Sequence, residues 1–176
     1  VNVGAIEEFQ RVNERYTYLS DQRADVEKAK TELEGIISSI TEQMKEIFAE
    51  QFELISNSFS QTFQELFRGG KASLELEDRD DILNCGIEIK VQPPGKSLKI
   101  ISLLSGGEKA FVAIALYFSI LKVRPTPFVV MDEIEAALDD ANVVRFARYM
   151  RNLTDHTQFI CITHRRGTME EADVLY

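Results

Sequence analysis

The chain has 176 residues, of which 44% are apolar, and a formal net charge of −9 at pH 7. This length and composition suit one modest domain with a hydrophobic core and exclude a largely disordered chain. The acidic average argues against nucleic-acid binding by bulk electrostatics, because phosphate attraction needs clustered lysines and arginines, and it leaves local basic patches open. Arg145, Arg148 and Arg151 recur at three-residue spacing, which we interpret as a solvated helix face. No run approaches the roughly 18 apolar residues that span a bilayer, so we expect a soluble cytoplasmic protein without membrane contact.

A long helix is predicted for the first third of the chain. No proline interrupts residues 7–67, and apolar residues recur there in a heptad frame. One track of this frame is apolar throughout, with Val12, Leu19, Val26, Leu33 and Ile40. In the second track Arg23 and Lys30 interrupt the apolar residues, as in a long coiled coil whose partner strand lies elsewhere. We therefore expect the early part of this helix to be exposed.

The later part of the same helix carries a dense aromatic stripe. Its members are Phe48, Phe52, Ile55, Phe59, Phe63 and Phe67. A stripe of this kind is typical of a helix face that packs on a domain. We therefore expect one helix whose first part is exposed and whose last part packs on the domain. Gly69 and Gly70 should end this helix as a glycine C-cap.

Beyond this helix the period of the apolar residues changes from helical to alternating. Two strands are predicted, at residues 72–77 and 86–92, with a polar connection at residues 78–81. Their inward-facing residues should be Leu74, Leu76, Ile87, Ile89 and Val91. After two prolines and a glycine, residues 98–104 form another short apolar stretch that we expect to be extended.

The remaining segments predict the order helix, strand, helix, strand. Residues 108–121 are typical of a buried helix and residues 128–131 of a buried strand, and residues 141–153 and 158–163 predict a second helix and a second strand. A strand–helix–strand unit usually places its two strands parallel and side by side. The predicted fold class is therefore α/β, with a parallel-strand sheet and flanking helices.

The segment Ser105-Gly106-Gly107-Glu108 is the first that could carry chemistry. Its pattern, S-x-x-E, matches a capping box, in which the serine and the glutamate satisfy backbone N–H groups at a helix start. A capping box does not explain the two glycines, because each is about 0.8–1 kcal/mol less favourable than alanine in a helix. Glycines are useful there when a phosphate must approach free N–H groups and the positive end of the helix dipole. Both interpretations stay open.

Two adjacent carboxylates, Asp132 and Glu133, follow the apolar strand at residues 128–131. They should lie at its carboxyl end, where ligands bind in open α/β sheets. One carboxylate could hold Mg²⁺ through its water shell, and the other could orient or deprotonate an attacking water. The alternative is that the acidic residues simply begin a loop.

His164 comes directly after the last predicted strand, so it should lie at the same sheet edge as the two carboxylates. A neutral imidazole there could hydrogen-bond a phosphate or the attacking water. A lone histidine at a strand end is more often structural or merely exposed, and His156 fits that description. The coincidence of three such segments favours half of a nucleotide-hydrolysing site.

The chain lacks a phosphate-binding loop of the form G-x-x-x-x-G-K-[ST]. In the nearest match, Gly95-Lys96-Ser97, Lys90 stands where the first glycine belongs. Two prolines directly before it also remove backbone donors. We interpret this segment as a strand connection and expect that the chain cannot bind ATP fully by itself.

Together these segments resemble the heads of ABC-type ATPases, and among them the bacterial SMC (structural maintenance of chromosomes) proteins. The segments that resemble the ABC signature, Walker B, the D-loop and the switch histidine are residues 104–108, 128–133, 137–139 and 163–164. Transporter and repair relatives usually read D-E-P-T after Walker B, whereas Glu133 is followed here by Ile134-Glu135. This acidic, proline-free variant is the SMC form, and the resemblance runs essentially end to end.

The resemblance implies that the chain is the C-terminal half of an SMC head. In that family this half returns from a distant hinge as an antiparallel coiled coil and completes a head that the N-terminal half began. Residues 1–47 would be the returning coiled-coil strand and residues 48–176 the C-terminal lobe of the ABC-type head. Walker A belongs to the other lobe, so its absence is expected, and a last strand and a tail should follow Tyr176.

The resemblance also implies roles for individual residues, with ATP and Mg²⁺ as cofactors. Asp132 would belong to the Mg²⁺ shell, Glu133 would act on the catalytic water, and His164 would contact the γ-phosphate. The residues expected to bind ATP, with the signature residues serving ATP held by the opposing head, are Ser105, Gly106, Gly107, Glu108 and Asp139. ATP hydrolysis would then require two engaged heads, and this chain alone should be inactive.

The implied partners are the N-terminal lobe of the same head, a second SMC head and a kleisin subunit that binds through a winged-helix domain. DNA would be reached through the full complex, in a nucleoid-associated protein that organises, condenses and segregates chromosomes. One alternative is the head of another coiled-coil ABC ATPase in DNA repair, against which Ile134-Glu135 argues. The other is a non-enzymatic docking module, against which the intact Glu133 argues.

Overall fold

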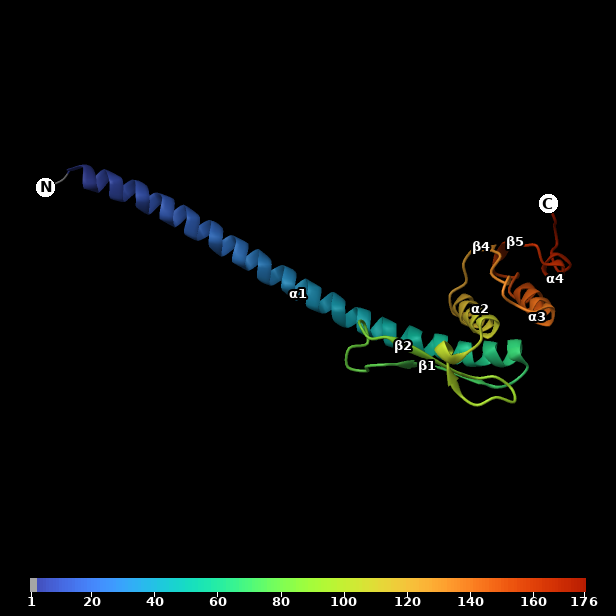
Figure 1. The fold of residues 1–176 in the computed structure, drawn as a ribbon. Helices are drawn as coiled ribbons and strands as arrows, with labels where there is room; N and C mark the ends of the chain where they lie inside the picture. Colours follow the sequence, from blue (N-terminus) through green and yellow to red (C-terminus); the bar gives the residue numbers. More distant parts are fainter. Residues whose placement is uncertain (1–2) are drawn as a thin grey trace. The chain divides into compact units, whose positions relative to one another are not determined.

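A computed structural model describes residues 3–176 of the chain (Figure 1). The chain divides into two compact units, Val1–Ile47 and Phe48–Tyr176. One helix, α1 (Val3–Phe67), begins in the first unit and ends in the second. Among the described residues, none of the helices combines the length and apolar character that a bilayer span needs.

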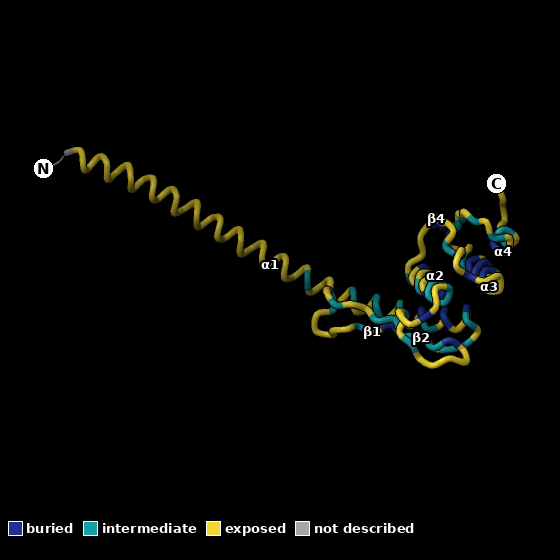
Figure 2. The backbone as a smooth tube through the Cα atoms, in the orientation of Figure 1, coloured by how far each residue is buried: buried dark blue, intermediate teal, exposed yellow. Residues whose placement is uncertain are grey.

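Helix α1 confirms the long helix predicted from the heptad frame. Its early apolar residues are exposed, for example Val12 at 58% and Ile40 at 50%, whereas Phe59 and Phe63 are completely buried (Figure 2). Exposed apolar residues in a heptad frame are typical of a helix that pairs with another helix. The interpretation of residues 1–47 as one strand of an antiparallel coiled coil stays a prediction.

Helix α1 ends in a left-handed turn at an arginine, not at a glycine as predicted. Arg68 has a φ of 58°, and Gly69 and Gly70 follow with φ values of 124° and 86°. The Gly69 amide donates to the Gln64 carbonyl at 2.8 Å, the bond that closes a Schellman motif. The predicted cap is therefore displaced by one residue. Gly70 is needed for space, because a Cβ there would lie 2.3 Å from the Gln92 carbonyl oxygen.

The first sheet of the second unit is antiparallel, with the strand order β1-β2-β3. Its strands are β1 (Lys71–Leu76), β2 (Ile87–Gln92) and the short β3 (Lys99–Ile100). Ala72, Leu74 and Val91 are buried, but Ile87 is 47% exposed, so its predicted inward position is wrong. Ile87 pairs with the last residue of β1, at the end of the ladder and away from the buried residues.

The apolar stretch at residues 98–104 is extended only in part. After β3 the chain turns into a short 3-10 helix, η1 (Ile101–Leu103). Leu104 then leads into α2 and is buried, whereas Leu98 and Leu103 are 59% and 67% exposed. The prediction of one extended segment is therefore wrong for its second half.

The rest of the second unit alternates helices and strands, as predicted. Its elements are α2 (Gly106–Val123), β4 (Phe128–Asp132), α3 (Asp140–Arg151), β5 (Gln158–Ile162) and the short α4 (Arg166–Met169). Strands β4 and β5 are parallel, with Phe128 opposite Gln158 and Asp132 opposite Ile162. The predicted α/β unit with parallel neighbouring strands is therefore confirmed.

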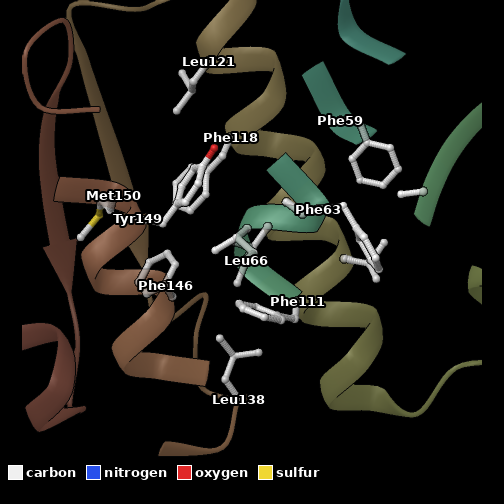
Figure 3. Packing of buried hydrophobic residues seen from close by; sticks show 14 of the residues in the cluster. Phe59, Phe63, Leu66, Phe111, Phe118, Leu121, Leu138, Phe146, Tyr149 and Met150 are labelled. Carbon is white, nitrogen blue, oxygen red and sulfur yellow. The ribbon is translucent and has the colours of Figure 1, made fainter. Parts of the chain in front are cut away.

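The core of this unit is an aromatic cluster where α1, α2 and α3 meet (Figure 3). The Phe118 ring stacks on Phe146 and Tyr149, with centroid distances of 5.7 and 5.3 Å. The rings of Phe67 and Phe111 join α1 to α2 at 4.7 Å. Aromatic pairs of this kind add about 0.5–1.5 kcal/mol beyond the area they bury. The aromatic stripe therefore packs the end of α1 onto the other helices.

The sheet of β4 and β5 is covered on one face and bare on the other. On the covered face Val129 and Met131 are buried, and the Cys161 sulfur lies 3.6 Å from the Met150 sulfur of α3. On the other face four apolar side chains are between 47% and 60% exposed, namely Phe128, Val130, Ile160 and Ile162. We call these four residues the bare face. A contiguous exposed apolar surface is typical of an interface.

The aromatic cluster yields a prediction about stability. Replacing the completely buried Phe118 by alanine should lower the free energy of unfolding by about 3–5 kcal/mol, because it leaves a cavity among three helices. Tyr117→Ala is the matched control, since Tyr117 is the adjacent residue and is 38% exposed. Urea unfolding of both variants measures the difference. Equal losses for the two variants would contradict the packing described here.

Candidate functional site

The parallel pairing of β4 and β5 brings the predicted carboxylates and the predicted histidine together. Asp132 is the last residue of β4 and lies opposite Ile162 of β5. Glu133 and His164 follow the two strands, and His164 Nε2 lies 2.8 Å from Glu133 Oε1. All three side chains are accessible to solvent at one end of the sheet. Their chemical roles stay predictions.

Glu133 leaves the strand in a left-handed backbone conformation, with a φ of 48°. This conformation is uncommon for a residue other than glycine and often marks functional sites. The Glu133 amide donates to the Ile162 carbonyl at 2.9 Å, and the Glu133 carbonyl accepts from the Ala136 amide at 3.0 Å. These two hydrogen bonds hold the residue where the chain turns out of β4.

The tip of α2 is formed by the segment that contains the two glycines. Ser105 is the N-cap, and the predicted capping box is present. The Glu108 carboxylate accepts hydrogen bonds from the Ser105 amide at 3.2 Å and from the Ser105 hydroxyl at 2.7 Å. Ser105 and Gly106 are exposed. The helix tip is therefore ordered by its own residues and still open to a ligand.

The two glycines have different surroundings. A Cβ at Gly107 would lie 2.9 Å from the Ala137 carbonyl oxygen, so Gly107 lets the helix tip approach the loop between β4 and α3. A Cβ at Gly106 would have no neighbour within 4 Å outside its own helix. Packing therefore explains Gly107, which the sequence could not reveal, whereas Gly106 faces open space.

Lys96, which the sequence placed only in a strand connection, lies at the same tip. Lys96 Nζ is 2.7 Å from Glu108 Oε1, and this contact together with the Ser105 hydrogen bonds lowers the pKa of Glu108 to about 2. The segment around Lys96 is a turn, with the Lys96 amide 3.1 Å from the Pro93 carbonyl, which confirms its interpretation as a strand connection. No spacing rule joins this turn to Glu108, so only the fold reveals the contact.

Asp139, predicted to contact ATP, is the N-cap of α3. Its carboxylate accepts from the Asn142 amide at 2.8 Å and from the Asn142 side chain at 3.2 Å. An N-cap of this kind stabilises a helix by about 1 kcal/mol. The residue therefore has a structural function whether or not it also contacts a nucleotide.

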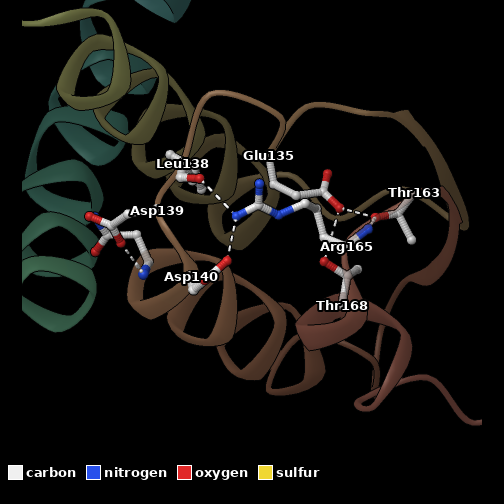
Figure 4. Close-up of polar contacts among 8 residues, drawn as sticks. Glu135, Leu138, Asp139, Asp140, Thr163, Arg165 and Thr168 are labelled. Atoms are coloured by element: carbon white, nitrogen blue, oxygen red, sulfur yellow. Dashed lines mark hydrogen bonds and ion pairs between the residues drawn. The ribbon is translucent and has the colours of Figure 1, made fainter.

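A buried carboxylate that the sequence did not reveal links the loops after β4 and β5 (Figure 4). Glu135 is only 2% exposed. Its Oε1 accepts a hydrogen bond from the Thr168 hydroxyl at 2.9 Å and a short one from the Thr163 hydroxyl. Glu135 is one of five acidic residues between positions 132 and 140, and nothing in the sequence distinguishes the buried one from the exposed ones.

An arginine makes a second link between the same two loops (Figure 4). Arg165 Nη2 donates to the Leu138 carbonyl at 3.0 Å and to Asp140 Oδ1 at 2.8 Å. The Arg165 amide donates to Thr163 Oγ1 at 3.0 Å. The residues on both sides of His164 are thus tied to the segment 135–140.

A groove of about 570 Å³ lies in another part of this unit, between the end of α1 and α3. It is lined by Glu65, Leu66, Arg68, Ala141, Val144, Arg145, Arg148, Tyr149 and Asn152. Two arginines of the three-residue row therefore border the groove, and Arg148 and Arg151 also pair with Glu171. The predicted site residues do not line this groove.

Two solved structures that resemble this chain are structures of SMC proteins. One is described as "Structural biochemistry of ATP-driven dimerization and DNA stimulated activation of SMC ATPases", with 44% identity, a TM-score of 0.69 and coverage of 74% of this chain and 80% of that chain. Another, from Pyrococcus furiosus, is the Smc head domain with an extended coiled coil bound to the C-terminal domain of ScpA. It is 41% identical, has a TM-score of 0.72 and covers 97% of this chain and 43% of that chain. The class is therefore the ABC-type α/β fold of SMC ATPase heads.

The chain belongs to the SMC proteins, within the family described as RecF/RecN/SMC N terminal domain, whose model matches residues 7–176. The chromosome partition protein Smc of Bacillus subtilis is 57% identical over 176 residues. The protein of the same name from Mycobacterium tuberculosis is 44% identical over 176 residues. In both cases the match covers 100% of this chain, which spans 15% of the length of the relative.

The low pKa of Glu108 predicts a pH dependence of stability. The pKa of its carboxyl group falls from an ordinary 4.5 to about 2 on folding. The ionised carboxylate therefore adds its full contribution to the free energy of unfolding above pH 4.5, and this contribution is lost as the pH falls towards 2. The difference in free energy of unfolding between the wild type and Glu108→Gln should therefore shrink over that interval. Urea unfolding at several pH values measures this difference. Lys96→Met, which removes the ion pair, should show a weaker pH dependence than the wild type, and a constant difference for Glu108→Gln would refute the assignment.

Proposed function

We propose that this chain is the C-terminal lobe of a bacterial SMC ATPase head. In this proposal it contributes a signature motif, a Walker B carboxylate pair and a switch histidine to ATP hydrolysis between two engaged heads. The observation that carries the proposal is the parallel pairing of β4 and β5, which leaves Glu133 and His164 2.8 Å apart beside Asp132. Membership of the SMC proteins supports the reaction class.

Two features of the chain support the C-terminal half, although the description of the matching family refers to an N terminal domain. The long helix α1 precedes the lobe in the chain, as expected for a half that a coiled-coil arm enters. The sequence also lacks a Walker A loop, which a complete nucleotide site needs for the β- and γ-phosphates. The half that begins a head would carry that loop.

The exposure of the bare face supports the proposal that a complementary lobe docks on it. Its residues Phe128, Val130, Ile160 and Ile162 lie on a sheet of only two strands. Parallel sheets normally have both faces covered, because their connections place helices on them. The proposed complementary lobe covers this face and extends the sheet. Asp132 lies on the same side of β4 as Phe128 and Val130, so the docked lobe would bring its nucleotide to Asp132.

Asp132 and Glu133 suit a magnesium-assisted hydrolysis. Mg²⁺ binds one or two carboxylates together with substrate phosphates and keeps several waters, and two adjacent exposed carboxylates fit this donor set. In this proposal Asp132 belongs to the Mg²⁺ shell, and the ion supplies positive charge against the phosphates. Glu133 orients the attacking water and accepts its proton. His164 hydrogen-bonds the γ-phosphate, which its exposed position beside Glu133 permits.

The tip of α2 serves a nucleotide held by the opposing head. Its exposed Ser105 and Gly106 offer a hydroxyl and free amides at the positive end of a helix of 18 residues. The open space beside Gly106 allows a phosphate to approach the backbone. One solved relative is described in terms of the ATP-driven dimerization of SMC ATPases, which supports this arrangement. Glu108 and Asp139 shape the site, because the first holds Ser105 and the second begins α3.

The partners follow from the relatives. Solved Smc heads are described as bound to the C-winged helix domain or the C-terminal domain of ScpA, which supports a kleisin partner for this lobe. In this proposal the complete protein organises, condenses and segregates chromosomes in the cytoplasm, associated with the nucleoid. The Bacillus subtilis relative is named chromosome partition protein Smc, which supports a role in chromosome partition. DNA is reached through the full complex, since the chain carries a net charge of −9.

Glu133→Gln tests the catalytic assignment. Mixed with a separately produced complementary lobe, this variant should lose ATP turnover by about 100-fold or more, because the amide cannot accept a proton from water. ATP-dependent dimerisation of the assembled heads should persist, since the substitution preserves shape. Glu170→Gln, at an exposed carboxylate paired only with Arg166, is the control and should keep turnover. Turnover retained by Glu133→Gln would remove the role assigned to this residue.

Ser105→Arg tests the contact across the heads. The larger side chain should block the tip of α2 and abolish ATP-dependent dimerisation, while ATP still binds to the complementary lobe of the same head. Sedimentation velocity with and without ATP separates the two states. Ser102→Arg, at an exposed position in η1, is the control and should still dimerise. Continued dimerisation of Ser105→Arg would show that the tip does not contact the opposing nucleotide.

A further inference from the structure

We propose that Glu135 and Arg165 are positioning residues that hold His164 against Glu133, one from each side of the histidine. This inference rests on the proposed function, in which Glu133 and His164 act on ATP. Neither Glu135 nor Arg165 touches the site directly. They act through the backbone of the loop that follows β5, and the contacts of that loop carry the proposal.

The His164 side chain has little to hold it in place. It is 84% exposed, and in the part of the chain that the structure describes its side chain makes one polar contact, with Glu133. The backbone of an exposed residue limits where its side chain can reach, and supporting residues must hold that backbone in place. The distance between His164 and Glu133 therefore depends on how the residues on either side of the histidine are fixed.

Glu135 fixes the residue before the histidine. Its buried carboxylate accepts hydrogen bonds from the hydroxyls of Thr163 and Thr168. Burying a carboxylate costs several kcal/mol unless it is well paired, and an apolar residue of similar size is often more stable in such a place. Hydrogen bonds are directional and apolar contacts are not, so this buried carboxylate defines where Thr163 lies, and hence where His164 begins.

Arg165 fixes the residue after the histidine. Its guanidinium bridges the Leu138 carbonyl and the Asp140 carboxylate, and its amide donates to Thr163 Oγ1. The Thr163 hydroxyl therefore donates to Glu135 and accepts from the Arg165 amide. It thereby joins the hydrogen bonds of Glu135 and those of Arg165 into one network. The hydrogen bonds of Thr163 and of the Arg165 side chain both reach the segment 135–140, which begins two residues after Glu133. The catalytic carboxylate and the histidine are thus built on one hydrogen-bonded frame.

Thr163→Val removes the central hydroxyl of this frame and keeps the shape of the side chain. In heads assembled with the complementary lobe, kcat for ATP should fall about 10-fold to 100-fold, because a displacement of about 1 Å at a reacting group has effects of this size. KM for ATP and ATP-dependent dimerisation should stay unchanged. Thr163→Ser, which restores the hydroxyl, should recover kcat to within about twofold. Thr154→Val, which removes an exposed hydroxyl bonded only within its own turn, is the control.

A double-mutant cycle with His164→Ala separates positioning from general loss of structure. If the frame acts through the histidine, Thr163→Val should reduce kcat no further once the imidazole is absent. An equal reduction in both backgrounds would overturn the inference, and so would an unchanged kcat for the single variant. Arg165→Met, which removes the two contacts that Nη2 donates to Leu138 and Asp140, repeats the test from the other side of the histidine if Thr163→Val does not fold. Glu133→Gln in the same assay reports on the proposed function itself. If that variant turns over normally, the proposed function fails, whereas if it is inactive and Thr163→Val is normal, only the positioning inference fails.

Discussion

The parallel pairing of β4 with β5 is the constraint on which the candidate site depends. It places Asp132 opposite Ile162, so that the first residues beyond each strand emerge side by side. The Glu133 amide continues the ladder to the Ile162 carbonyl, and the chain then turns away in a left-handed conformation. A slip of one residue in this register would move every side chain of β4 to the other face and carry Asp132 away from the bare face.

Around this edge, structural and chemical functions are divided among neighbouring residues. Gly107 allows α2 to approach the Ala137 carbonyl, whereas Gly106 leaves the backbone at the tip of α2 accessible to a ligand. Asp139 caps α3, and the segment 135–140 holds the loop that carries His164. The α2 tip therefore lies close to the same short segment that is hydrogen-bonded to the residues on both sides of His164.

The sequence predicted those features that arise from local periodicity. The helix α1, the strand–helix–strand unit and the capping box at Ser105 were all predicted, because each depends on residues close in the chain. Contacts between distant segments could not be predicted, such as Lys96 with Glu108 or the burial of Glu135. Local rules also failed where the ladder ends, at Ile87, and where an arginine took the left-handed position expected for a glycine.

The proposed function requires a second lobe that completes the sheet of β4 and β5 and brings the nucleotide to it. Hydroxyl-radical footprinting of this chain, alone and with the complementary lobe, tests this requirement directly by measuring oxidation of side chains on the bare face. We expect Phe128, Val130, Ile160 and Ile162 to be oxidised in the isolated chain and protected when the lobe is bound. A lobe that binds while these four residues remain as reactive as before would contradict the account.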